Sequence, residues 1–226
     1  MPAANAYTFL QLQDAVIGRR FPGSSQRDNA KRWLATAYED VWSAARADGN
    51  EWQFEIVSRA TIAMTSGDST PTMPSDFGDA LNLYDDSGVP MQRYSQEDFE
   101  YRYSDILLTS QTGLPEAYTV VNRQIEVAPI PTTTTFRLSY RRRLSHKESD
   151  GTTVTGGFFD EDTDYPLWDD HHTVLIPRAT AIGLIEINDP TWDQAQQEYE
   201  RQLARMKDDY VAERPIRQWG ALAWDA

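Results

Sequence analysis

Carboxylates crowd into the stretch from Asp160 to Asp170, where side chains of this type could chelate a divalent cation. Clustered Asp and Glu oxygens are the ligands that Ca²⁺ prefers. The stretch lacks the spacing, the glycine and the terminal glutamate of the common calcium loop, so it indicates a solvated acidic loop without a metal. His171 and His172 follow, but adjacent helix positions point in different directions, so we expect them to start a helix. The acids are Asp160, Glu161, Asp162, Asp164, Asp169 and Asp170.

Other enzymatic chemistry finds little support in the sequence. The chain has no cysteine, which excludes a disulfide framework, a thiolate metal site and a Cys nucleophile. It also lacks a Gly-x-Ser-x-Gly elbow, a Walker loop, a His-Glu-x-x-His motif and a dinucleotide fingerprint. Asp85 and Asp86 could in principle act as a glycosidase pair, yet sequence neighbours rarely face each other across a substrate. We therefore expect no enzymatic activity and no cofactor.

Composition points to a folded protein that does not grip nucleic acid. With 226 residues, 40% hydrophobic and 12% aromatic, the chain can bury a core as one large domain or as a domain with an insertion. The formal net charge of −14 opposes DNA binding, because phosphates are neutralised by clustered Lys and Arg. An acidic surface would instead let DNA slide past. The first residues contain neither a basic segment nor a long apolar run, so we expect a cytosolic chain without a signal peptide or membrane span.

The sequence contains four helical patterns, two near the N-terminus and two after the acidic stretch. The first covers Tyr7 to Arg20, and the second runs from a cap at Ser24 or Ser25 to about Ala47. The second helix carries an apolar stripe whose tryptophans are expected in the core. Its members are Ala30, Trp33, Leu34, Ala37, Tyr38, Val41, Trp42 and Ala45.

Two further helices are expected after the acidic stretch. One starts near Asp170 and ends at Asn188, with Pro177 marking a kink or a late start. The next has Asp189 as its cap and Pro190 at its first position. Ile185 is expected on the apolar face of the first of these helices. The seam of the second is Trp192, Ala195, Tyr199, Leu203, Met206 and Tyr210.

Between these pairs of helices the pattern changes to strands. A strand is expected from Trp52 to Met64, followed by a hairpin that turns at residues 85–88 and a short helix from Ser95 to about Tyr103. Residues 113–140 form the densest strand pattern, with prolines at the strand ends because proline cannot donate to a sheet. Phe136, Leu138 and Tyr140 are expected on one sheet face.

These elements predict an α+β fold in which a bundle of N- and C-terminal helices carries an inserted β-rich domain, sandwich- or barrel-like. We expect bundle helices at 1–50, the β-rich domain at 51–148 and an acidic loop at 149–168. The C-terminal helices should cover 169–211, and 212–226 should be an extended docking tail.

An ordered series of motifs in the β-rich region resembles a known family. MPSDFGDALNLY (73–84) comes first, GLPEAY (113–118) follows, and an Asn turn, IEVAPIP (125–131) and FRLSYRRR (136–143) complete the series. The series is similar to the β-rich core of head-to-tail adaptor, or connector, proteins of short-tailed and related bacteriophages. The resemblance covers about Pro71 to Arg143.

The resemblance implies a structural, non-enzymatic protein of the virion neck that is assembled in the host cytoplasm. It implies a ring of copies, expected to be a dodecamer, between the portal protein and a nozzle or other downstream tail protein. Double-stranded DNA would pass through the ring without specific contacts, and no membrane would be involved.

Three groups of residues are candidate contact sites. An apolar tail must either fold back on the body or dock on a partner, and the resemblance favours docking on the portal. The cluster Arg141, Arg142 and Arg143 is either a solvated strand end or a contact with an acidic neighbouring subunit or with DNA. The acids Asp160, Glu161, Asp162 and Asp164, with those of the last helix, are candidates for a channel wall. The tail anchors are Ile216, Trp219, Leu222 and Trp224.

A second function stays open at this point. Tyrosine and tryptophan stack well on sugar rings, and the chain has 11 Tyr and 7 Trp. The alternative is therefore a tail module that binds saccharides or the host surface.

Overall fold

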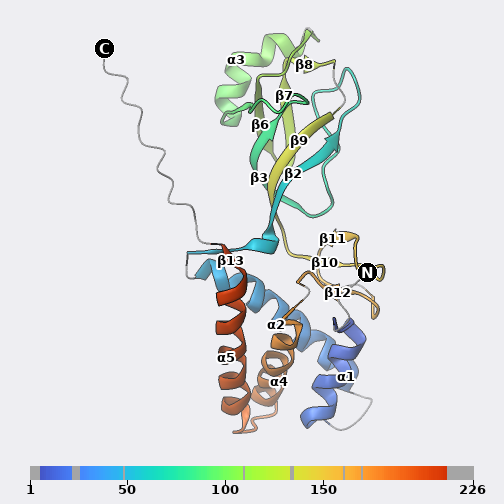
Figure 1. Cartoon of the computed structure of the whole chain (residues 1–226), viewed down its shortest axis with the longest axis vertical. Coiled ribbons are helices and arrows are strands. Elements are labelled where there is room, and N and C mark those ends of the chain that lie inside the picture. The colour runs from blue at the N-terminus through green and yellow to red at the C-terminus, as the bar shows by residue number, and fades with distance from the viewer. Residues whose placement is uncertain are drawn as a thin grey trace, which may run out of the picture. The chain divides into compact units, whose positions relative to one another are not determined.

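The computed structural model describes residues 6–21, 26–47, 49–108, 110–132, 135–159, 161–168 and 170–212 (Figure 1). The chain divides into two compact units. We call residues 1–54 with 159–226 the helical unit, and residues 55–158 the β unit. Helices and strands are both well represented, which confirms the α+β class. The described strands form several small sheets, and none of these closes into a barrel.

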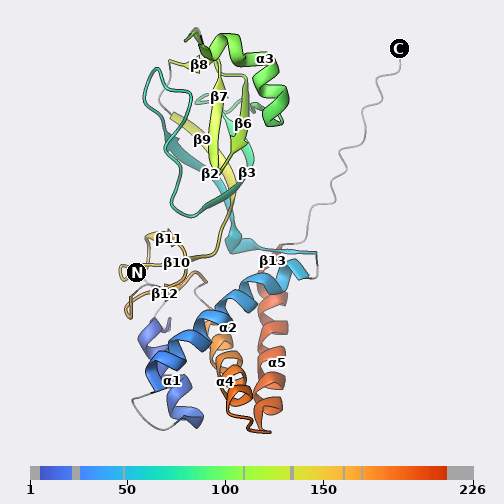
Figure 2. The same cartoon turned by 180° about the vertical axis from the view of Figure 1, so that it is seen from behind.

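The helical unit contains the four expected helices, two from each end of the chain. They are α1 (Phe9–Arg20), α2 (Arg27–Ala47), α4 (Leu175–Glu186) and α5 (Trp192–Tyr210). Helix α4 packs against the other three, and α2 runs obliquely across it (Figure 2). The short strands β1 (Glu51–Trp52) and β13 (Val211–Ala212) pair antiparallel at the end of α5, and β12 (Tyr165–Pro166) precedes α4.

Small residues let α4 lie close to its neighbours. A methyl group built on Gly183 would lie 2.7 Å from Cζ of Phe21 and 2.9 Å from Cε3 of Trp33, so only glycine fits the present packing. The indole of Trp33 donates a hydrogen bond to Oε2 of Glu186 at 2.8 Å, and Arg32 pairs with the same carboxylate at 2.7 Å. These contacts fix the end of α4 against α2.

The tryptophans of α2 are buried, as its apolar stripe predicts. Trp33 and Trp42 are 2% and 4% exposed. Near the end of α2, the indole N–H of Trp52 donates to the carbonyl oxygens of Val41 and Trp42 at 3.1 and 3.0 Å. The ring of Trp168 stacks on that of Tyr38 at 4.9 Å. Aromatic packing therefore joins α2 to the strand that follows it and to the segment before α4.

The helix ends differ in part from the prediction. Helix α1 is capped by Thr8, whose Oγ1 accepts a hydrogen bond from the Gln11 amide. Pro177 lies in the first turn of α4, where its missing N–H costs nothing, so the late start is confirmed. The predicted cap of the last helix is wrong. Thr191 holds that position, and Asp189 instead accepts hydrogen bonds from the Thr191 amide and hydroxyl at 2.8 and 2.7 Å.

The β unit is built from two three-stranded sheets with one helix. In the first sheet, β9 (Thr135–Arg142) lies between β2 (Ile56–Ala63) and β3 (Phe77–Tyr84). The second contains β4 (Gln92–Arg93), β6 (Ala117–Val121) and β7 (Gln124–Ala128). Two short pairs complete the unit: β5 (Thr112–Gly113) with β8 (Ile130–Pro131), and β10 (Ser145–Lys147) with β11 (Val154–Gly156).

The sheets share a core whose residues follow the predicted alternation. Phe136, Leu138 and Tyr140 are 0%, 0% and 4% exposed and pack with side chains of β3, β6 and β7. Helix α3 (Gln96–Leu108) covers β6 and β7 with Phe99 and Tyr103. The β6–β7 hairpin turns at Asn122 and Arg123, which both have positive φ, as the tight two-residue turn requires.

Two of three predictions for this unit need correction. The expected strand from Trp52 to Met64 is interrupted by a 3-10 turn at Gln53–Glu55, because Glu55 is buried there and the alternation fails. The predicted hairpin at residues 85–88 is confirmed, because Tyr84 and Pro90 form an antiparallel bridge and the Met91 amide donates to the Leu83 carbonyl at 2.8 Å. The chain then continues into β4, which pairs with β6 and runs parallel to it. Helix α3 has the expected cap at Ser95, yet it continues five residues beyond Tyr103 to Leu108.

Candidate interaction surfaces

Acids of the stretch from Asp160 to Asp170 form hydrogen bonds and an ion pair with residues of α1 and α2. The Asp162 carboxylate accepts a hydrogen bond from the Gln13 amide at 2.9 Å and pairs with Lys31 at 3.0 Å. These partners, the Gln13 hydrogen bond first, hold the pKa of Asp162 below its usual value. Asp164 is 3% exposed, and its Oδ2 accepts from the Glu161 amide at 2.9 Å.

Backbone hydrogen bonds complete this attachment of the acidic stretch. The amide of Phe9 donates to the carbonyl of Asp164 at 2.7 Å, and the amide of Leu10 donates to that of Asp162 at 2.9 Å. Of the four acids predicted for a channel wall, Glu161 is exposed, the Asp162 side chain is 42% exposed, and Asp160 lies outside the described residues. Within the described parts of the chain, no group of three or more His, Asp or Glu side chains is placed to hold a metal ion.

The adjacent histidines lie at a helix start, as predicted. His171 has φ of 58° at the cap of the 3-10 turn His172–Val174, which leads directly into α4. Its Nε2 lies 2.6 Å from Oδ2 of Asp209, near the end of α5. His172 is buried, and its ring contacts Tyr7 edge-on at 4.8 Å. The two side chains thus bind different elements.

The basic cluster at the end of β9 has partners inside the β unit. Arg142 Nε lies 2.7 Å from Oδ2 of Asp76, which is 3% exposed. The other carboxylate oxygen of Asp76 accepts from the Tyr140 hydroxyl at 2.8 Å. Arg143 donates to the carbonyl oxygens of Ser75 and Gly156 at 3.0 and 3.4 Å. Arg142 and Arg143 therefore hold the strand end in place, and a contact with a neighbouring subunit stays a prediction.

The α4–α5 turn carries an exposed apolar patch that the sequence patterns did not reveal. Ile185, Ile187 and Trp192 are 48%, 56% and 40% exposed, although Ile185 and Trp192 were expected on buried faces. Ile185 and Ile187 are two positions apart at the end of α4, and one helix face cannot bury both residues at that spacing. This spacing could have predicted that at least one of the two isoleucines is exposed. The residues Ile185, Asn188, Asp189, Pro190 and Trp192 line a hollow of about 320 Å³, which we call the tip hollow.

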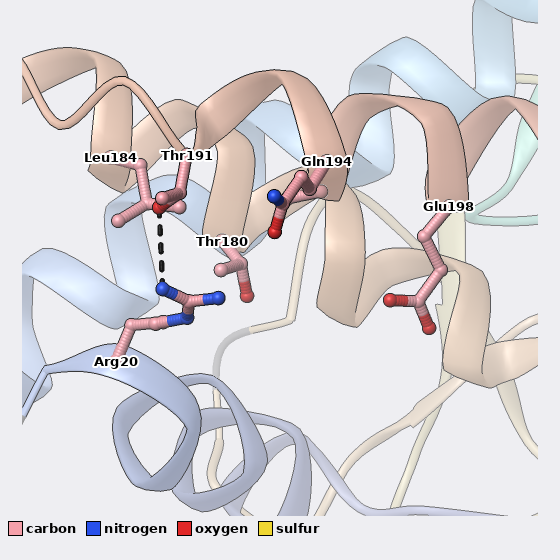
Figure 3. A pocket seen from close by; sticks show the side chains of 7 residues that line it. Arg20, Thr180, Leu184, Thr191, Gln194 and Glu198 are labelled. Carbon is pink, nitrogen blue, oxygen red and sulfur yellow. Dashed lines mark hydrogen bonds between the residues drawn. The ribbon is translucent and has the colours of Figure 1, made fainter.

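A second, more polar hollow of about 220 Å³ lies between α1, α4 and α5. Figure 3 shows Arg20 reaching from α1 toward α5, where its Nη1 donates to Oγ1 of Thr191 at 3.3 Å. Glu198 lies further along α5, on the other side of Gln194. One cation, one carboxylate and uncharged polar groups suit hydrogen bonding to another protein surface.

Helix α5 contributes one titrating group to the core of the helical unit. Tyr199 is 6% exposed, and its ring lies 5.4 Å from the guanidinium of Arg178. Burial raises the pKa of Tyr199 to about 12, from an ordinary value of 10.0. The unfolded chain loses the Tyr199 proton at a lower pH than the folded chain does. The contribution of Tyr199 to the free energy of unfolding is therefore fully present below pH 10 and is lost as the pH rises from 10 to 12.

We expect that loss to reach about 1.4 kcal/mol per pH unit in that window. Urea unfolding followed by tryptophan fluorescence would measure it, since the tryptophans of the chain all lie outside the β unit. Tyr199→Phe has no proton to lose and should show a smaller decline over the same window. Equal declines in the two proteins would contradict the assignment to Tyr199.

A sequence model of the SU10 adaptor protein family matches residues 7–222, which include both units. The chain belongs to the SU10 adaptor protein family. This membership confirms the resemblance drawn from the β-rich motifs. No curated protein matches the chain.

Membership of the SU10 adaptor family gives the chain a structural role in a bacteriophage particle, where adaptors contact other head and tail proteins. Among the helices that the structure describes, none is both long and apolar enough to cross a bilayer. The residues predicted as anchors for portal docking, Ile216, Trp219, Leu222 and Trp224, lie outside the described residues. The family match extends to residue 222 and so includes three of these four anchors.

Proposed function

We propose that this SU10-family chain is a head-to-tail adaptor that forms a ring between the portal and the tail and encloses a channel for double-stranded DNA. The family match over residues 7–222 carries the proposal. A ring needs surfaces that fit neighbouring copies, and the exposed apolar patch at the α4–α5 turn offers one. The net charge of −14 supports a channel through which DNA moves without adhering, because an acidic wall repels the phosphates.

Each part of the chain has a role in this proposal. The helices at 1–50 and 169–211 form a bundle that serves as the ring wall, and the sandwich-like domain at 51–148 contacts neighbours or the downstream tail protein. Residues 149–168 supply channel acids, among which Glu161 and the partly exposed Asp162 are described, and 212–226 dock on the portal. We propose a dodecamer in the virion neck, assembled in the host cytoplasm.

The ring is tested by mixing the purified chain with portal particles. Negative-stain microscopy should show an added ring below the portal, and native mass spectrometry should count its copies. A chain that stays monomeric beside intact portal particles would exclude the ring.

Portal docking is tested by removing residues 214–226. The truncated chain keeps β13, whose Val211 and Ala212 pair with Trp52 and Glu51, so the helical unit should fold as before. We expect its affinity for portal particles to fall at least a hundredfold, since aromatic anchors commonly contribute more than 2 kcal/mol each. Co-sedimentation with portal particles would measure the loss, with circular dichroism as the control for folding. Unchanged sedimentation would show that docking uses another surface.

A further inference from the structure

The sheet β2–β9–β3 of the β unit has one face in the core and one outer face. Successive side chains of a strand point to opposite faces, and Leu138 of β9 is in the core, so Arg137 points outward. The register places Arg137 beside Thr61 of β2 and Tyr84 of β3. Tyr84 is half-buried and the other members of this surface are exposed. We call the surface the arginine face; it consists of Arg59, Thr61, Asn82, Tyr84 and Arg137.

A bulge in β2 directs Arg59 onto this face. The pairing of β2 with β9 shifts register between Val57 and Ala60, and Arg59 lies within the bulge with φ of 53°. Residues other than glycine seldom adopt this left-handed conformation, because the side chain crowds the backbone. The Arg59 amide donates to Oγ of Ser139 at 3.0 Å, and its guanidinium lies 5.3 Å from the ring centre of Tyr84. Bulges re-aim side chains and strained residues cluster at binding sites, so this position points to a ligand.

Two positive charges adjoin Tyr84 without a counter-ion in the part of the chain that the structure describes. Arg59 contacts the ring, and Arg137 is its cross-strand neighbour. Neither guanidinium pairs with a carboxylate among the described residues, whereas nearby Arg93 pairs with Asp79 at 3.1 Å. Like charges close together on a sheet face repel each other, and an anion held between them would offset that repulsion. The arginine face therefore has the chemistry of an anion-binding surface.

Carboxylates suit this surface better than the phosphates of a nucleic acid. Guanidinium groups bind both anions through paired N–H donors. On β3, however, Asp79 precedes the arginine face, and the exposed Asp86 follows it in the turn after Tyr84. A nucleic acid carries a phosphate at every step and would meet these acids, whereas a short acidic segment can match the two arginines alone. The net charge of −14 adds to the repulsion of a long polyanion.

The observations favour a different protein over a second copy as the source of such a segment. The densest acidic stretch of this chain is engaged within the helical unit, where Asp162 pairs with Lys31 at 3.0 Å and Asp164 is 3% exposed. Two copies that each carry a net charge of −14 also repel each other. Other head and tail proteins, which an adaptor contacts, are then the favoured source.

We propose that the arginine face of the β unit binds an acidic segment of a neighbouring protein in the phage particle, with Arg59 and Arg137 each pairing with a carboxylate. The Asn82 amide and the Thr61 hydroxyl supply further hydrogen bonds to the segment. The proposal rests on the adaptor function only for the identity of the neighbour. The contact itself is tested on the isolated chain, so it can fail while ring formation and portal docking stand.

Binding of a defined peptide to the intact chain tests the proposal. An acetylated tetraglutamate peptide is titrated into isotope-labelled protein, and amide chemical shifts are followed by NMR. We expect the shifts to concentrate at Thr61, Asn82 and Arg137, and a tetraglutamine peptide to cause none. Arg59→Gln/Arg137→Gln should weaken binding of the tetraglutamate peptide about tenfold, because two ion pairs are lost.

Arg201→Gln/Arg205→Gln is the matched control. These arginines of α5 are exposed and four positions apart, so the substitutions remove the same charge from the helical unit. They should leave the peptide affinity unchanged. Equal weakening by the two double variants would show a general attraction of charge and would overturn the proposal. Tighter binding of duplex DNA than of the peptide would also overturn it, as would self-association of the wild-type chain that Arg59→Gln/Arg137→Gln abolishes in sedimentation.

Arg59→Asn separates binding from folding. Asparagine adopts positive φ more readily than arginine and keeps the amide that donates to Ser139, so hydrogen-exchange protection of β9 should stay the same or rise. The peptide affinity should nevertheless fall about threefold, because one cation is lost. Unchanged peptide affinity would overturn the binding role of Arg59, and lower protection of β9 would show that this residue serves the fold instead.

Discussion

Replacing Asp76 with alanine is expected to lower the free energy of unfolding of the β unit by about 3–5 kcal/mol. The Asp76 carboxylate is 3% exposed and has two partners, the Arg142 guanidinium at 2.7 Å and the Tyr140 hydroxyl at 2.8 Å. Alanine would remove the buried carboxylate that pairs with Arg142 and accepts from the Tyr140 hydroxyl, and breaking a buried pair by removing one member is the costly case for an internal ion pair. Burial, and then the hydrogen bond to Asp76, raise the pKa of Tyr140, so its hydroxyl stays protonated and donates at neutral pH.

Asp79→Ala is the matched control for this prediction. Asp79 also pairs with an arginine, Arg93, at 3.1 Å, but the two side chains are 46% and 45% exposed. An exposed pair of this kind contributes less than about 1 kcal/mol. Hydrogen exchange of β9 peptides is the appropriate measurement, because the β unit contains no tryptophan to report its unfolding. Similar losses of protection in the two variants would contradict a special role for the buried carboxylate.

Gly183→Val is expected to lower the free energy of unfolding of the helical unit by nearly as much as Asp76→Ala lowers that of the β unit. The first added carbon would lie 2.7 Å from Phe21 and 2.9 Å from Trp33, well inside van der Waals contact. Neither ring can move freely, because Phe21 and Trp33 are 5% and 2% exposed and the Trp33 indole is hydrogen-bonded to Glu186. Overpacking of this kind costs about 1–3 kcal/mol, and we expect the upper end because α4 contacts the other three helices.

Gly18→Ala provides the opposite result in a neighbouring helix. Gly18 lies in α1, and a methyl group built there meets nothing within 4 Å. Alanine should stabilise the helical unit by about 0.5–1 kcal/mol, because it restricts the unfolded chain and favours the helix. Urea unfolding followed by tryptophan fluorescence reports directly on this unit. If both glycine substitutions changed stability in the same direction, the close approach at Gly183 would not be the cause.

Local periodicity was sufficient to predict most of the elements. The stripe that contains Trp33 and Trp42 predicted α2 and its buried face, and the alternation of Phe136, Leu138 and Tyr140 predicted the inner face of β9. Both patterns predict the structure correctly because the large apolar side chains in them must be buried, and their spacing fixes which face of the helix or strand is inside. The alternation from Trp52 onward failed at Glu55, because tertiary packing there buries a charged residue and forces a 3-10 turn.

The contacts of the candidate surfaces could not be predicted, because they join residues distant in sequence. Arg142 reads as part of an exposed basic run, and only the fold brings it to Asp76. Asp162 reads as one acid among many, and only the fold gives it Gln13 and Lys31. Trp192 was placed in a seam by its spacing, but at the start of α5 its side chain is 40% exposed.

The pairing of β1 with β13 has a mechanical consequence for the C-terminal segment. Tension on that segment enters the protein at Ala212, which is paired with Glu51, and passes through Val211 to Trp52. The indole of Trp52 is fully enclosed and is held by two carbonyl oxygens of α2. A pulling force on the C-terminal segment would therefore be shared between α2 and α5.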